Sequence, residues 1–321
     1  MLRCAQHDIK PLYGQRSNSI FFNLLKLGLT ISILMLAARY VHTEKLLTTI
    51  STIRINYLAF AFILLVPNLS LQYFKWRLLL RQIDPNIKSV AAWHSLLAGF
   101  PLGLVTPGRW GEIGRAIFLP GYPRLAIAGL AAIDKITNFA SIVILGCAGS
   151  AFLLYSGFLA QFPSWRSWPL SLVPLASCLL LFSPALVKRA WRRVIERGDS
   201  SSWLAVLKNF DAKLVGKLSV LSFLFVLTFS LQLVILVCGL HPVPPGDGMA
   251  AAFTTFFIQS LLPLSIGDLG IRESAAAFFF GKLGVAPNVA FDAGLTLFII
   301  NMLLPSALGL FLLWKKKPPS L

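Results

Sequence analysis

Three ionisable side chains with regular spacing stand out in the sequence, and their chemistry is that of a phosphate-binding site. Arg109, Glu112 and Arg115 follow one another at intervals of three residues. If a helix begins near Gly108, the three side chains share a broad face, and the carboxylate can pair with either guanidinium group. The positive end of that helix would add to the two arginines and favour a bound phosphate. The alternative is a self-neutralising network that only stabilises a bend in the chain.

The backbone around these charges is unsuited to a continuous helix, although the surrounding sequence is strongly apolar. Prolines and glycines recur through it, at Pro101, Gly103, Pro107, Gly108, Gly111 and Gly114. Irregular backbone and charge inside a membrane are tolerated only where they are buried in protein or line a wet cavity. We therefore expect a broken, re-entrant helical hairpin, with hinges at Pro101, Pro107, Gly108 and Gly111.

A second stretch of the same kind, residues 262–273, lies late in the chain. It predicts another hairpin, with hinges at Pro263, Gly267 and Gly270. Asp268 and Arg272 are four residues apart with the acid first, the favourable order for an ion pair within a helix, and Glu273 adjoins them on a different face. These side chains form either an opposing gate or headgroup contact, or only an ion pair within the helix. Two broken elements in corresponding halves point to the binding site of a transporter.

A further pair of charges, Asp134 and Lys135, lies about ten residues into the long apolar run 125–156. A lone charge at this depth is costly, so a partner is expected. Asp134 can pair with Arg109 or Arg115 and so complete a cavity around the first motif. The alternative is that Lys135 extends to the cytoplasmic interface, where its ammonium group reaches water.

The elements that must position these residues are membrane helices. Hydrophobic residues make up 56% of the 321 residues, charged residues make up 13%, and the mean hydropathy is +0.75. Such a composition is that of an integral membrane protein. The predicted spans are residues 20–41, 56–74, 125–156, 168–187, 218–240 and 289–314. The fold class is therefore all-α.

The order of these segments predicts an inverted repeat inside one membrane domain, residues 1–321. Each half reads span, span, hairpin, span, and the two halves begin on opposite sides of the membrane, as in many transporters. The first repeat covers residues 20–156 and the second covers residues 168–314. Because residues 89–106 would be roughly 27 Å long as a helix, enough to cross completely, eight spans are the alternative to six spans and two hairpins.

The net charge of +17 reflects the orientation of the chain rather than nucleic-acid binding. Lys and Arg are abundant in the amino-terminal residues, in residues 75–88 and 188–217, and at the carboxyl terminus, but sparse in residues 157–167 and 241–248. Basic loops stay in the cytoplasm. We expect a multi-pass protein of the cell inner (plasma) membrane with both termini cytoplasmic.

The two motifs also carry a resemblance. Pro107-Gly-Arg-Trp-Gly-Glu-Ile-Gly-Arg115 and Gly267-Asp-Leu-Gly-Ile-Arg-Glu273 resemble the signature segments of the lysylphosphatidylglycerol synthase transmembrane family, also called the flippase-like domain family. The resemblance implies a module that moves a modified phospholipid between leaflets. Its substrate would be a membrane lipid, and its partner would be a separate lipid-modifying enzyme. The soluble aminoacyltransferase domain of the best-known relatives is not in this sequence, so we expect a transporter rather than an enzyme.

Three functions compete at this stage. The first is a lipid transporter for an anionic phospholipid, a polyprenyl-phosphate-linked lipid or a glycosylated lipid. The second is a membrane-embedded transferase acting on a lipid-phosphate carrier, although the cytoplasmic loops lack the paired acids of a nucleotide-sugar site. The third is an assembly partner in envelope biogenesis. The scattered residues Cys4, Cys147, Cys178 and Cys238 and the lack of a P-loop predict no disulfide, metal or nucleotide cofactor.

Overall fold

The computed structural model describes residues 28, 53–158, 210–262 and 269–315, and the regular elements in these residues are all helices. The α-helices are α3 Ile55–Leu80, α4 Ser89–Leu104, α5 Arg124–Tyr155, α9 Ala212–Leu240, α10 Pro245–Leu261, α11 Ile271–Lys282, α12 Pro287–Phe298 and α13 Leu304–Lys315. A 3-10 helix, η1, covers Trp110–Phe118, and a π-helix, η3, covers Ile299–Leu303 and joins α12 to α13. The predicted all-α fold class is confirmed.

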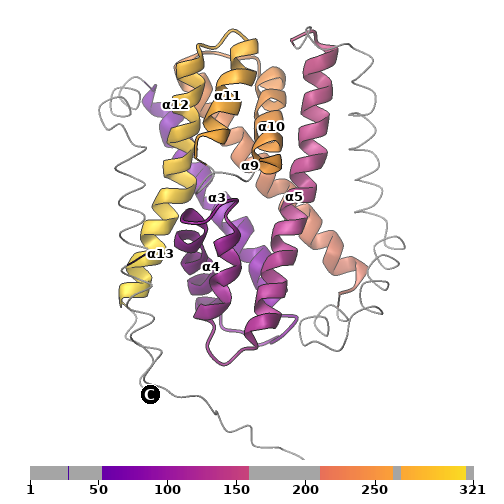
Figure 1. The fold of residues 1–321 in the computed structure, drawn as a ribbon, viewed down its shortest axis with the longest axis vertical. Coiled ribbons are helices and arrows are strands. Elements are labelled where there is room, and N and C mark those ends of the chain that lie inside the picture. Colours follow the sequence, from indigo (N-terminus) through magenta and orange to yellow (C-terminus); the bar gives the residue numbers. More distant parts are fainter. Residues whose placement is uncertain (1–27, 29–52, 159–209, 263–268, 316–321) are drawn as a thin grey trace, which may run out of the picture.

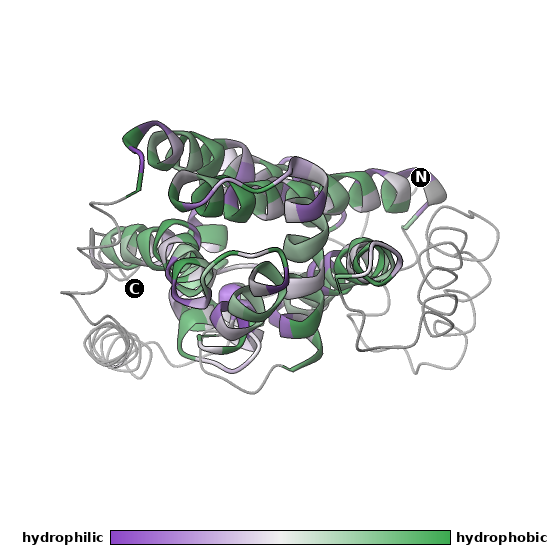
Figure 2. Ribbon diagram, turned by 90° about the horizontal axis from the view of Figure 1, so that it is seen from above, coloured by the Kyte–Doolittle hydropathy of each residue, from purple (hydrophilic) through white to green (hydrophobic). Residues whose placement is uncertain are grey.

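Four of the described helical segments are long and apolar enough to cross a membrane. They are Ile55–Leu80, Arg124–Tyr155, Lys213–Leu240 and Pro287–Leu312. Many large apolar side chains on them face outward, among them Ile63, Val66 and Phe311, each at least 60% exposed, as expected for surfaces that contact lipid. Figure 2 shows the same predominance of hydrophobic residues on the described helices. The predicted spans 20–41 and 168–187 lie outside the described residues.

The end of the first described span differs from the prediction. The sequence was expected to leave the membrane after residue 74, with Lys75 and Arg77 in a basic loop, but α3 continues to Leu80. Lys75 is buried, with 2% of its surface exposed. Its charge lowered the local hydropathy and suggested a loop, whereas the helix continues because the ammonium group has buried partners within the bundle.

The first motif forms a hairpin. η1 runs back along α4, so that Gly99 lies beside Arg115 and Gly103 beside Glu112. A Cβ atom added to Gly111 would lie 2.0 Å from the carbonyl oxygen of Leu102, which requires glycine at this close crossing. Figure 1 shows that α4 and α5, the helices on either side of η1 in the sequence, both begin at the same end of the bundle. Residues 89–118 therefore return to the side from which they entered, as in the six-span interpretation.

The predicted hinges of this hairpin are only partly at its turn. Pro107 and Gly108 lie between α4 and η1, but Pro101 lies inside α4, three residues before its end. Proline cannot donate to the carbonyl of Leu97 one turn earlier. That carbonyl is instead covered by α13, where a Cβ atom on Gly309 would approach it to 2.2 Å. Pro101 thus serves a helix–helix contact rather than the turn.

The second hairpin consists of α10 and α11, which lie side by side at the opposite end of the bundle from α4 (Figure 1). Its tip, residues 263–268, lies outside the described residues, including the predicted hinges Pro263 and Gly267. Gly270, the third predicted hinge, precedes α11 with a φ of 88°, a value that glycine adopts readily. The inverted repeat stays a prediction, because one predicted span of each half is not described.

Small residues bring α10 close to the long helix α5. A Cβ atom on Gly146 would lie 2.2 Å from the Cβ atom of Phe257, and one on Gly149 would lie 2.7 Å from the carbonyl oxygen of Ala250. Glycine at such crossings lets membrane helices pack through their backbones. This contact fixes the second hairpin against α5, which also carries Asp134 and Lys135.

Candidate functional site

The turn before η1 places the first motif. Gly108 and Arg109 both have positive φ angles, 58° and 57°. The hydroxyl of Thr106 closes the turn, because it accepts a hydrogen bond from the backbone N–H of Gly111 at 2.7 Å and donates to the carbonyl of Leu102 at 3.0 Å. The sequence predicted a helix starting near Gly108, but the 3-10 helix starts two residues later. In a 3-10 helix, side chains three residues apart lie nearly above one another, so the predicted spacing still produces one charged stripe.

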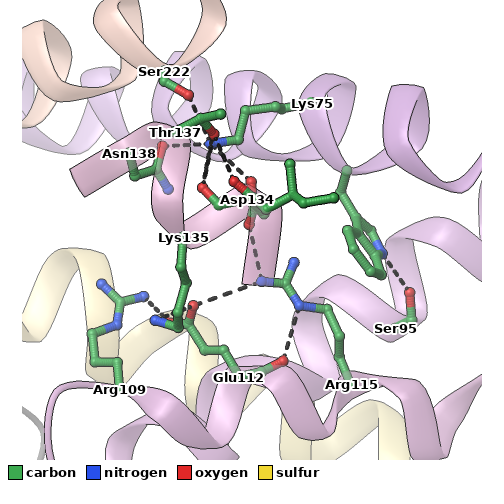
Figure 3. A network of polar contacts seen from close by, with 12 residues as sticks. Lys75, Ser95, Arg109, Glu112, Arg115, Asp134, Lys135, Thr137, Asn138 and Ser222 are labelled. Atoms are coloured by element: carbon green, nitrogen blue, oxygen red, sulfur yellow. Dashed lines mark hydrogen bonds and ion pairs between the residues drawn. The ribbon is translucent and has the colours of Figure 1, made fainter. Parts of the chain in front are cut away.

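Glu112 is the centre of the first part of the network (Figure 3). Its carboxylate forms an ion pair with Arg109, and the Nζ atom of Lys135 lies 3.3 Å away. The guanidinium of Arg115 is 3.8 Å from the same carboxylate, and its Nε–H donates to the Glu112 carbonyl at 3.0 Å. Lys135 therefore extends to the motif rather than away from it.

Asp134 is the centre of the second part. One carboxylate oxygen lies 3.0 Å from an Nη atom of Arg115, and the other lies 2.8 Å from the Nζ atom of Lys75. Of the two arginines predicted as partners, Arg115 is thus the one that pairs with Asp134. The guanidinium of Arg115 also lies over the indole ring of Trp76, 4.3 Å from its centroid, and the indole N–H donates to Ser95 at 2.8 Å. These contacts hold Arg115 in one orientation.

Lys75 is the residue of this network that sequence reasoning missed. Its ammonium group donates to Asn138, to the hydroxyl of Ser222 at 3.0 Å and to the carbonyl of Asp134 at 3.2 Å. A signal was present, because Asn68, Gln72 and Lys75 recur at helical spacing in an otherwise apolar segment. Such a polar stripe marks the face of a membrane helix that turns toward the protein interior.

The second hairpin contributes a separate ion pair. Arg272 pairs with the adjacent Glu273, and the other carboxylate oxygen of Glu273 accepts a hydrogen bond from the backbone N–H of Gly270 at 2.7 Å. The guanidinium of Arg272 lies 5.6 Å from the centroid of the Phe298 ring. Asp268, the predicted partner of Arg272, lies outside the described residues. Arg272 and Glu273 are 7% and 1% exposed, so this pair is buried.

A cavity of about 480 Å³ brings the two hairpins together. Arg109 and Glu112 line it from the first hairpin, and Arg272 lines it from the second. Asp134 and Lys135 of α5 also line it. Arg115 and Glu273 are not among the lining residues, and they support the cavity from behind. Six of the seven residues predicted as headgroup contacts therefore lie in or directly behind one cavity, four from the first motif and α5 and two from the second motif. The seventh, Asp268, lies outside the described residues.

The rest of the wall is apolar. Phe139 and Ile142 contribute from α5, Phe225 and Phe229 from α9, and Leu297 from α12. Phe139 is 45% exposed at the outer surface of α5, so the apolar wall continues onto the face of the bundle. A polar end beside an apolar wall suits an amphipathic ligand.

The charges that the described residues place around the cavity do not balance. Six ion pairs join five cationic side chains to three carboxylates, namely Lys75, Arg109, Arg115, Lys135 and Arg272 with Glu112, Asp134 and Glu273. The Nε atoms of Arg109 and Arg272 are buried and have no hydrogen-bond partner within the described residues. Buried donors without partners are rare in folded proteins. The excess of positive charge and these free donors fit an anion.

A second hollow, of about 690 Å³, lies between α3 and α9. It is lined by Arg77, Arg81 and Lys217 together with apolar residues such as Phe74. Among the described residues, no carboxylate lines this hollow and neither motif contributes to it. It is therefore a basic groove apart from the charged network, and the cavity between the hairpins is the candidate site.

These features define an α-helical membrane protein in which two hairpins from opposite ends of the bundle share a cationic, partly apolar cavity. The chain matches the family described as "Lysylphosphatidylglycerol synthase TM region" over residues 23–309, and it belongs to this family. The resemblance of the two motifs is thereby confirmed, and the function of the chain lies with membrane lipids. No curated protein and no solved structure shows significant similarity to it.

Proposed function

We propose that this protein moves an anionic, phosphate-bearing lipid between the two leaflets of the membrane. The observation that carries the proposal is the shared cavity, in which Arg109 of one hairpin and Arg272 of the other line the same space. Guanidinium groups bind phosphate through charge-assisted hydrogen bonds. Both arginines have a buried Nε donor that an incoming phosphate oxygen can engage.

The apolar wall supports a lipid as the phosphate carrier. Phe139, Phe225 and Phe229 lie in the same cavity as the arginines, so a headgroup and the first part of its hydrocarbon chains can be accommodated together. The proposed location is the cell inner (plasma) membrane, with both termini in the cytoplasm, as the distribution of Lys and Arg among the loops suggests.

The proposed movement uses the two hairpins in turn. They begin at opposite ends of the bundle (Figure 1), so displacement of one hairpin opens the cavity toward one side and displacement of the other opens it toward the second side. In this proposal Glu112, which pairs with Arg109 and Lys135, exchanges partners with Arg272 as the cavity changes its opening.

The proposal is tested by reconstituting the purified chain into liposomes that contain a fluorescent phosphatidylglycerol and following the dye's accessibility to a membrane-impermeant quencher. We expect the protein to accelerate the exchange between leaflets, and Arg272→Gln to abolish the acceleration. Lys213→Gln is the matched control, since Lys213 is exposed in the first turn of α9 and lines neither hollow. Exchange no faster than in protein-free liposomes contradicts the proposal, and chemically altered lipid in the liposomes would indicate a transferase instead.

A further inference from the structure

Amide side chains form a second polar surface in the same cavity. Asn68 and Gln72 of α3, Asn138 of α5 and Asn301 of the π-helix η3 all line it. π-helical segments are uncommon and frequently occur at functional sites. This one contributes the Asn301 side chain to the lining of the cavity.

Three of these amides, those of Asn68, Gln72 and Asn301, belong to a hydrogen-bond network centred on the buried Gln232 of α9. Its Oε1 atom accepts hydrogen bonds from Asn301 at 2.7 Å and from Asn68 at 3.4 Å, and its own Nε2 donates to the carbonyl of Ala61 at 2.8 Å. Gln72 in turn donates to Asn68 at 2.8 Å. Gln232 is fully buried. The network therefore connects α3, α9 and η3 and fixes the amide positions before any ligand arrives.

One atom of this surface has no partner. While the Nδ2 atom of Asn301 is engaged on Gln232, its Oδ1 atom is buried and accepts no hydrogen bond within the described residues. A buried acceptor of this kind is satisfied when a ligand donates to it. Amide groups both donate and accept, which matches a hydroxyl group and gives no preference for a charge.

The carboxylates of the cavity are already engaged. Within the described residues the only acids that line it are Glu112 and Asp134. Glu112 pairs with Arg109 and lies 3.3 Å from Lys135, while both oxygens of Asp134 are within 3.0 Å of cationic nitrogens. Among the described residues, an ammonium group on a headgroup would therefore meet several fixed cations and no unpaired carboxylate, which is electrostatically unfavourable.

From these two features together we infer that the ligand is a lipid with one phosphate and an uncharged, hydroxyl-bearing headgroup, and not a lipid whose headgroup carries an amino group. The phosphate lies between Arg109 and Arg272, and a headgroup hydroxyl donates to Oδ1 of Asn301. This inference rests on the proposed function and narrows its substrate class. It separates this chain from the aminoacylated lipid after which its family is described.

The inference is tested by lipid binding to the full chain in detergent, measured by native mass spectrometry. The probes are phosphatidylglycerol, phosphatidic acid, lysyl-phosphatidylglycerol and soluble glycerol 3-phosphate. We expect phosphatidylglycerol to bind about tenfold more tightly than phosphatidic acid, which lacks the hydroxyls, and at least tenfold more tightly than the lysyl lipid. Glycerol 3-phosphate should bind weakest, because it cannot use the apolar wall.

Variants assign the preference to the amides. Asn301→Leu, and Gln72→Met as a second variant of the same surface, should reduce phosphatidylglycerol binding to the level of phosphatidic acid and leave phosphatidic acid unchanged. Arg272→Gln should weaken both lipids. Asn288→Leu is the control for the asparagine change, since Asn288 is exposed at the start of α12 and away from the cavity.

The outcomes distinguish a failure of this inference from a failure of the proposed function on which it rests. Equal affinity for the lysyl lipid and phosphatidylglycerol overturns the inference while leaving lipid transport in place. The inference is also overturned if both amide variants weaken the binding of phosphatidylglycerol and of phosphatidic acid to the same extent. Equal binding of glycerol 3-phosphate overturns the assignment of a lipid ligand. Binding of none of the probes, together with no lipid exchange in liposomes, contradicts the proposed function itself.

Discussion

The Nζ atom of Lys75 lies 2.8 Å from a carboxylate oxygen of Asp134, although the two residues are 59 positions apart and both are buried. The contact joins α3 to α5 behind the cavity. Because Asp134 also binds Arg115 of η1 at 3.0 Å, the same carboxylate connects the first hairpin to both spans. The position of the charged stripe on η1 therefore depends on a lysine that does not itself line the cavity.

Replacing Lys75 by methionine should destabilise the protein strongly. Methionine is unbranched and only one atom shorter than lysine, but it leaves Asp134 with one cationic partner fewer. Removing one member of a buried ion pair costs about 3–5 kcal/mol. Unfolding by denaturant in detergent micelles measures this change. Lys213→Met, on the exposed surface of α9, is the control and should change the unfolding free energy by less than about 0.5 kcal/mol. Similar losses in the two variants would show that the Lys75–Asp134 contact does not stabilise the bundle.

Adding a single methyl group at Gly111 should disrupt the first hairpin. The Cβ atom of Gly111→Ala would lie 2.0 Å from the Leu102 carbonyl oxygen, a backbone atom that cannot rotate away. We expect a loss of about 1–3 kcal/mol or more. In Gly216→Ala the new Cβ atom meets nothing within 4 Å, and this helix glycine should instead gain up to about 1 kcal/mol. Thermal unfolding of both variants is the measurement, and a Gly111→Ala protein as stable as Gly216→Ala would contradict the close crossing of η1 and α4.

A pH-dependent hydrogen bond joins the loops that precede and follow the first hairpin. The hydroxyl of Tyr122, in the turn before α5, donates to the Asp84 carboxylate in the loop before α4 at 2.6 Å. This bond, followed by one from the backbone N–H of Asn86, lowers the pKa of Asp84, and the bond to Asp84 raises the pKa of Tyr122. A lowered carboxyl pKa contributes stability above its unfolded value, about 3.9, that is lost as the pH falls through the folded pKa. A raised phenol pKa contributes stability that is fully present below its unfolded value, about 10, and is lost as the pH rises through the folded pKa.

Tyr122→Phe should therefore be less stable than the natural protein at neutral pH, and the difference should shrink at both extremes. Thermal unfolding of the two proteins across the pH range measures it. Tyr155→Phe controls for the loss of a hydroxyl, since Tyr155 is 66% exposed at the end of α5. A difference between the natural protein and Tyr122→Phe that stays constant down to a pH well below the unfolded pKa of aspartate would contradict the role of Asp84.

The sequence indicated the helical class, the two motifs and the two arginine partners of Glu112, because each depends on composition or on spacing within one segment. It did not indicate that Lys135 of α5 pairs with Glu112. The pairing of Lys75 with Asp134 depends instead on the packing of α3 against α5 and α9, which no local pattern specifies. Lys75 was therefore assigned to a loop. Asn301 was missed for a related reason, since its role follows from a π-helical turn that directs it toward Gln232. Pro101 was assigned to the turn because proline usually ends a helix, whereas α4 continues past it where Gly309 covers the free carbonyl.

Linking the two hairpins across the cavity should stop lipid movement. Trp110 of the first hairpin and Ser260 at the end of α10 both line the cavity, and Trp110 is 59% exposed. Gly111 is unsuitable for this purpose because any side chain there meets Leu102. Trp110→Cys together with Ser260→Cys, in a protein without its natural cysteines, can be joined by a short reducible bifunctional reagent. If the cavity opens by displacement of one hairpin relative to the other, the joined protein should lose lipid exchange in liposomes, and reduction should restore it.

The two single-cysteine proteins, treated with the same reagent, should retain exchange and so control for modification alone. Full exchange in the joined protein would show that the hairpins do not move apart during transport.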